Sequence, residues 1–75
     1  MQRQPVSSSN VASVGWAPIE EGEDIGTLEV EFHYGHVYQY AEVPQSVYRD
    51  AISASSVGRF MNQSVIGQYD ETRVA

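Results

Sequence analysis

The chain has 75 residues, which suffices for one small domain but excludes a catalytic domain joined to a separate substrate domain. It has no cysteine, which excludes disulfides and thiolate metal sites and is typical of a cytoplasmic protein. Ten acidic residues against four arginines, with no lysine, give a net charge of −6 and exclude the broad basic face on which long nucleic acids bind.

The first half of the chain predicts two strands separated by an acidic loop. Residues 1–9 are polar and indicate a flexible leader. Residues 11–16 alternate between apolar and small or polar side chains, which favours a strand that ends at Pro18 because proline has no backbone N–H. Residues 19–26 are rich in acidic and turn-forming residues, so we expect a solvated loop. Residues 27–32 then alternate cleanly and predict the second strand.

A third strand, at residues 36–41, is predicted to pair with residues 27–32 in a hairpin. A three-residue loop that ends in a left-handed glycine is a common hairpin connection, and the segment 33–35 ends in Gly35. The predicted register pairs Phe32 with His36, Val30 with Tyr38 and Leu28 with Tyr40. A two-residue loop would turn the tyrosines towards the glutamates, so the register that gathers the apolar side chains on one face is favoured.

Two short helices are predicted after the hairpin. Pro44 suits a first helical position, and an apolar stripe at helical spacing follows it, formed by Val47, Tyr48, Ala51 and Ile52. Ser55 or Ser56 can cap a second helix that runs to about Ser64. The predicted fold is α+β: a three-stranded antiparallel meander with two short helices packed on one face, spanning residues 10–69 and followed by a tail at 70–75.

An ordered set of short motifs resembles the KTSC domain family. The set comprises Gly26-Thr-Leu-Glu-Val-Glu-Phe32, Gly35, Val37-Tyr-Gln-Tyr40, Val43-Pro44 and Ser55-Ser-Val-Gly-Arg-Phe60 with Asn62. The resemblance covers about residues 7–69 and implies a stand-alone bacterial or phage member of a family named for the C-terminus of some lysine-tRNA synthetases. That setting suggests RNA binding, but relatives commonly carry a basic residue where Ile66 stands, which weakens the implication for this chain.

The start of the second helix is the candidate anion site in the sequence. A capping Ser56 leaves free N–H groups at the positive end of the helix, and Gly58 would let a ligand approach the backbone closely. Arg59 would add a bidentate contact to phosphate or carboxylate, with Asn62 on an adjacent turn. The alternative is an ordinary helix cap with a surface arginine.

Tyr38 and Tyr40 have two interpretations. They form either a platform on which nucleic-acid bases stack or part of the core beneath the helices. His33 and His36, with Glu31 nearby, do not converge in the predicted register and lack a third ligand. No metal site and no cofactor is therefore expected.

These residues favour a small non-enzymatic binding module of unknown partner. A protein partner or a homo-oligomer is favoured first, because the core is small and the edges of a short meander invite pairing. One alternative is a nucleic-acid or small nucleotide-type ligand at the second helix start, although the net negative charge weakens RNA binding. The other is a small enzyme, for which neither a nucleophile motif nor a phosphate-binding glycine loop is present.

No signal peptide is seen and no apolar run approaches the roughly 18 residues of a membrane span, so we expect a cytoplasmic location and no membrane partner.

Overall fold

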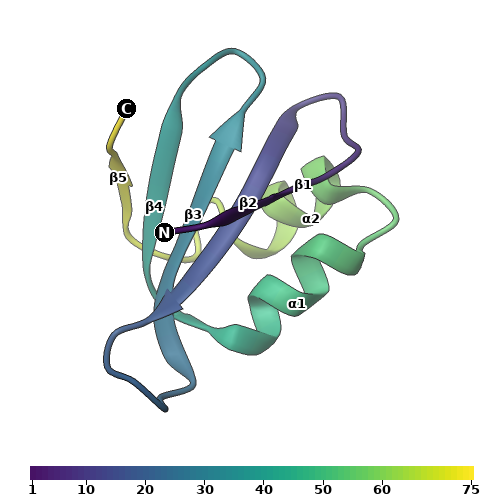
Figure 1. Cartoon of the computed structure of the whole chain (residues 1–75). Coiled ribbons are helices and arrows are strands. Elements are labelled where there is room, and N and C mark those ends of the chain that lie inside the picture. The colour runs from purple at the N-terminus through teal and green to yellow at the C-terminus, as the bar shows by residue number, and fades with distance from the viewer.

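An antiparallel sheet of five strands, in the order β1-β2-β3-β4-β5, forms one layer of the molecule, and two helices pack together on one side of it (Figure 1). The computed structural model describes residues 1–75. The elements in chain order are β1 (Arg3–Pro5), β2 (Val11–Pro18), β3 (Ile25–Phe32), β4 (Val37–Pro44), α1 (Gln45–Ser53), α2 (Val57–Ser64) and β5 (Glu71–Arg73). The α+β class with two helices on one sheet face is confirmed. Neither helix has the length and apolar character needed to cross a membrane.

The sheet has two more strands than the predicted three-stranded meander, so the predicted strand number is wrong. Both extra strands come from segments predicted as a leader and a tail, residues 1–9 and 70–75. β1 pairs with the outer edge of β2, and β5 pairs with the outer edge of β4. Each has three residues that are mostly exposed, so neither carries the apolar alternation by which a strand is recognised in a sequence.

The β3–β4 hairpin has the predicted register. Leu28 pairs with Tyr40 and Val30 with Tyr38, and the N–H of Phe32 donates to the carbonyl of His36 over 3.0 Å. Gly35 has a φ of 105°, in the left-handed region, and its N–H closes the loop on the carbonyl of Phe32 over 2.9 Å. Because the register is confirmed, the apolar side chains of both strands lie on the face that the helices cover.

The core lies between that face and the helices. Its ten buried residues are Val11, Val14, Leu28, Val30, Phe32, Tyr40, Val43, Val57, Met61 and Val65. Helix α2 contributes Val57 and Met61, four residues apart and therefore on one side of the helix. α1 buries Ala51 and adds partly buried side chains at its margin. This packing fixes the start of α2 against the sheet.

The opposite face of the sheet carries a polar network that ties β1 to the central strands. Arg3 donates to Ser13 Oγ over 3.0 Å and forms an ion pair with Glu29. Gln39 also donates to Glu29, and Ser13 donates to Glu31, both over 2.9 Å. Burial alone would raise the pKa of Glu29, but the hydrogen bonds from Gln39 and Arg3 and the charge of Arg3 outweigh it and hold the pKa below its ordinary value.

A glycine makes room for β1 on this face. Gly15 is paired with Arg3, and a Cβ at Gly15 would clash with the carbonyl oxygen of Gln2 and lie 3.0 Å from Arg3 Cγ. The missing side chain therefore lets the N-terminal segment pass close over β2 and bring Arg3 within reach of the carboxylate on β3.

Candidate functional site

The start of α2 has the capped geometry predicted from the sequence. Ser56 is extended, with φ −135° and ψ 102°, and its Oγ accepts a hydrogen bond from the N–H of Arg59 over 3.3 Å. The carbonyl of Ser56 accepts from the N–H of Phe60 over 3.0 Å. The first two helical N–H groups, of Val57 and Gly58, donate to no group of the chain. They are therefore free to donate to a ligand at the positive end of the helix.

The segment of residues 7–10 forms a second wall opposite this helix start. The Oγ of Ser8 accepts from the N–H groups of Asn10 and Val11, each over 3.2 Å, which folds the segment into a tight turn. The carbonyl of Ser8 also contacts Nε2 of His33 over 2.9 Å. These contacts hold the segment beside the β3–β4 hairpin.

Gly58 allows the start of α2 and residues 7–10 to lie close together. A Cβ at this position would lie 3.3 Å from Asn10 Nδ2 and 3.8 Å from Ser8 Oγ. The absent side chain was predicted to admit a ligand, and in the structure it leaves room for Asn10 as well.

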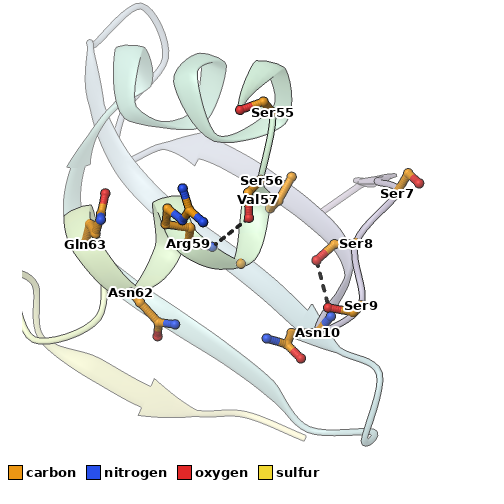
Figure 2. Close-up of a pocket in the computed structure, with 11 residues that line it drawn as sticks. Ser7, Ser8, Ser9, Asn10, Ser55, Ser56, Val57, Arg59, Asn62 and Gln63 are labelled. Atoms are coloured by element: carbon orange, nitrogen blue, oxygen red, sulfur yellow. Dashed lines mark hydrogen bonds between the residues drawn. The ribbon is translucent and has the colours of Figure 1, made fainter.

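A pocket of about 540 Å³ lies between the two walls (Figure 2). Its lining residues are Ser7, Ser8, Ser9, Asn10, Ser55, Ser56, Val57, Gly58, Arg59, Asn62 and Gln63. Only Val57 among them is hydrophobic, and only Arg59 is ionisable. Arg59 forms no ion pair within the chain. The pocket therefore offers hydrogen-bonding groups and one unpaired cation.

The structure brings four of the predicted site residues into this pocket: Ser56, Gly58, Arg59 and Asn62. The sequence prediction missed the wall formed by residues 7–10, because residues 7–9 fall in the predicted flexible leader and Asn10 is the first residue of the predicted domain. Three serines followed by an asparagine are a turn-forming run, and that composition was the signal available in the sequence.

The two remaining predicted residues, Tyr38 and Tyr40, do not reach this pocket. Tyr40 is fully buried in the core, and its hydroxyl donates to Glu71 Oε2 over 2.7 Å. Burial first, and then the contact with Glu71, raise the pKa of Tyr40 well above its ordinary value. The core interpretation is therefore confirmed for Tyr40.

Tyr38 is only partly buried and lines a second, smaller pocket of about 310 Å³. The residues around this pocket are Asn10, Phe32, Tyr34, Tyr38, Tyr40, Ile66 and Glu71. Asn10 lines both pockets, so they are neighbours on the molecule. The predicted site residues are thus divided between a polar pocket and an aromatic one.

The side chains of His33 and His36 contact different parts of the molecule. His33 meets the carbonyl of Ser8, whereas the ring of His36 lies edge-on to Tyr34 and Tyr38, with ring centroids 5.0 and 6.3 Å away. No group of three His, Asp or Glu side chains in the chain is placed to hold a metal ion.

Comparison with known proteins finds a matching family model, similar sequences and a similar solved structure. The family model described as the KTSC domain matches residues 7–69. A protein of Tsukamurella paurometabola is 41% identical over 59 residues, which cover 79% of this chain and 81% of that protein. An uncharacterised protein of Stutzerimonas stutzeri is 38% identical over 63 residues, covering 84% of this chain and 82% of its own length.

A crystal structure of a KTSC domain protein from Yersinia pestis has the same fold. The two chains superpose with a TM-score of 0.84 at 37% sequence identity, and the match covers 99% of this chain and 97% of the other. The family match spans most of the sequence, including the helix start and the hairpin that form the two pockets. This chain therefore belongs to the KTSC domain family.

Proposed function

We propose that this chain is a small non-enzymatic binding module that holds a small polar ligand with an anionic group in the pocket at the start of α2. The observation that carries the proposal is the composition of that pocket, which is almost wholly polar and has Arg59 as its single charged side chain. Its volume of about 540 Å³ is in the range of small-molecule sites.

The pocket supports binding rather than catalysis. General acid–base catalysis needs a side chain that gains or loses a proton near the working pH, and arginine, the only ionisable residue type in the lining, is not such a side chain. No histidine, carboxylate or lysine lines the pocket to take a proton from one of its serines. Hydrogen bonding and one fixed positive charge are therefore what the lining supplies.

The charge of the chain favours a small ligand over a long polyanion. One anionic group needs one cationic partner and two or three N–H donors, which Arg59 and the N–H groups of Val57 and Gly58 supply. A long RNA would place further phosphates against a molecule of net charge −6. A nucleotide-sized anion fits these constraints better than RNA does.

A protein-binding role is the second candidate, supported by exposed apolar side chains. Tyr34, Ile66 and Val74 are exposed large hydrophobic residues, and Tyr34 and Ile66 line the same aromatic pocket. The edges of the meander, on which pairing with another chain was predicted, are occupied by β1 and β5. Light scattering over a range of concentrations tests self-association, and a constant monomer mass would count against the homo-oligomer.

Calorimetric titration tests the small-ligand proposal. The probes are inorganic phosphate, a panel of nucleoside mono- and triphosphates and a short RNA, each at two salt concentrations. We expect saturable binding of one nucleotide class with a shallow salt dependence, because few counterions are released, whereas RNA binding would show a steep one.

Two arginine variants separate the local site from the overall charge. Arg59→Ala should abolish nucleotide binding without unfolding the domain, since Arg59 is exposed and only its backbone N–H takes part in the helix cap. Arg49→Ala makes the same change of net charge on the exposed side of α1 and should leave binding intact. Equal binding by the wild type and Arg59→Ala, or no binding of any probe, would overturn the proposal.

A further inference from the structure

The aromatic pocket lies where the β3–β4 hairpin and β5 meet Ile66, the second residue after the end of α2. Four of its seven lining residues are aromatic, and Ile66 is a fifth hydrophobic one. Glu71, which comes from β5, is its only charged lining residue. This composition differs sharply from that of the polar pocket beside it.

The rings of this pocket are arranged as an open corner. Tyr34 lies nearly parallel to Phe32, with ring centroids 5.5 Å apart and an angle of 21° between the ring planes. Tyr38 meets Phe32 at 76°, with centroids 5.7 Å apart, so its ring forms a second wall. Tyr34 is 65% exposed, so burial of its own surface does not explain its position over the pocket.

A carboxylate is fixed beside these rings. Oε2 of Glu71 accepts the hydrogen bond from the buried hydroxyl of Tyr40, while Oε1 has no partner in the chain. The hydrogen bond holds the charge at the pocket while Oε1 remains free to contact a ligand. The negative carboxylate and the electron-rich faces of aromatic rings both attract a positive charge.

Arg73 is the one cation close to this pocket in the sheet. It pairs with Tyr38 across β4 and β5, but it does not line the pocket, and its Nε donates to the carbonyl of Ala75 over 3.0 Å. Its charge opposes that of Glu71 locally, whereas the net charge of −6 draws cations to the molecule as a whole.

We propose that the aromatic pocket binds an organic cation, an alkylammonium or guanidinium group, through the rings of Tyr34 and Tyr38 and the carboxylate of Glu71. This site adjoins the anion pocket at α2 and shares Asn10 with it, but none of the three proposed cation contacts lines that pocket. The cation belongs either to a free small molecule or to a lysine or arginine side chain of another protein, and both present the same chemistry to the pocket.

A pair of isosteric probes isolates the role of the charge. Choline and 3,3-dimethylbutan-1-ol have nearly the same shape, but a quaternary nitrogen in the first is a neutral carbon in the second. Amide chemical shifts in NMR titrations should show saturable binding of choline around Tyr34, Tyr38 and Ile66. The neutral alcohol should bind at least about fivefold more weakly than choline, because it lacks the attraction between a cation and the rings.

Three variants test the residues. Glu71→Gln keeps an acceptor for Tyr40 and should weaken choline binding severalfold while leaving the alcohol unaffected. Tyr34→Leu replaces an exposed ring and should also weaken choline binding. Arg73→Met removes the opposing charge and should strengthen it. The NMR spectrum of each variant reports whether its fold is intact.

Two further probes distinguish the sources of the cation. Tighter binding of N-acetyl-arginine amide or N-acetyl-lysine amide than of choline would indicate a protein side chain, and the reverse order a small molecule. Equal binding of choline and its neutral isostere would show an ordinary apolar groove and overturn the proposal, as would no saturable shift with any of the cations. Neither outcome bears on nucleotide binding at Arg59, which is measured separately.

Discussion

Replacing Arg3 with Met is expected to loosen β1 from the sheet, because the guanidinium of Arg3 holds that strand to the open face. It donates to Ser13 and pairs with Glu29. Glu29 is only 8% exposed, so the variant leaves a nearly buried carboxylate with Gln39 as its remaining side-chain donor. Methionine keeps an apolar stem of similar length over Gly15, so the change removes charge and hydrogen bonds more than packing.

The cost follows from the burial of the two partners. A hydrogen bond to a charged group contributes about 1.5–3 kcal/mol, and breaking a fully buried pair costs about 3–5 kcal/mol. The Arg3 side chain is 29% exposed, so solvent screens this pair, and we expect about 2 kcal/mol. A domain of this size has a total stability of about 4–11 kcal/mol, so this loss is a large part of it. Each kcal/mol lowers the Tm of such a domain by about 4–8 °C, so Tm should fall by roughly 8–16 °C.

Urea unfolding followed by the fluorescence of Trp16, the single tryptophan, measures this loss. Arg49→Met is the matched control, since it makes the same change of net charge at an exposed position on α1. A double-mutant cycle with Glu29→Gln should give a coupling energy of about 1 kcal/mol or more between Arg3 and Glu29. If Arg3→Met were no more destabilising than Arg49→Met, or the coupling were zero, the network would not hold β1 in place.

Three further predictions concern stability. Because the pKa of Glu29 is lowered in the fold, its ionised form stabilises the protein above the ordinary pKa of 4.5, and this contribution is lost as the pH falls through the lower folded pKa. The difference in unfolding free energy between the wild type and Glu29→Gln should therefore narrow in acid, and a constant difference would contradict the assignment. Gly35→Ala should cost about 1 kcal/mol in urea unfolding, because no atom lies within 4 Å of the added Cβ and only the left-handed φ opposes it; an unchanged midpoint would refute this. Met61→Ala should cost about 2–5 kcal/mol by leaving a cavity under α2, and a loss below 1 kcal/mol would indicate that the core closes around it (about 1 kcal/mol is the scale of an ordinary substitution).

The central hairpin was predictable because two independent signals agree there. The alternation of Leu28, Val30 and Phe32 gives the inward face, and Gly35 gives the loop length, so only one register satisfies both. A serine cap on α2 was predictable for a similar reason, since a serine before an amphipathic run is a local signal that needs no knowledge of the rest of the fold. The sequence left Ser55 and Ser56 as alternatives, and the structure has Ser56 as the cap.

Burial along β4 was not predictable from alternation alone. Tyr38 and Tyr40 share one face of the sheet in the predicted register, yet only Tyr40 is fully buried. The difference arises because Tyr40 lies in the core cluster with α2 and meets Glu71 of β5, whereas Tyr38 lies nearer the loop of the hairpin. Which of two such residues is core depends on packing between distant segments, and periodicity within a strand carries no information about it.

The terminal segments complete both pockets as well as the sheet. Residues 7–10 form one wall of the polar pocket, and Glu71 supplies the charge of the aromatic one. Polar contacts hold both segments in place: the turn around Ser8 holds residues 7–10, and the hydrogen bond from Tyr40 holds Glu71. Polar contacts of this kind leave no apolar periodicity in the sequence by which either segment could be recognised. The residues at the start of α2 present half of a binding site, and the other half comes from a part of the chain that looks unstructured in sequence. Removal of residues 1–9 or 70–75 should therefore abolish ligand binding at the corresponding pocket even where the three central strands and both helices remain folded.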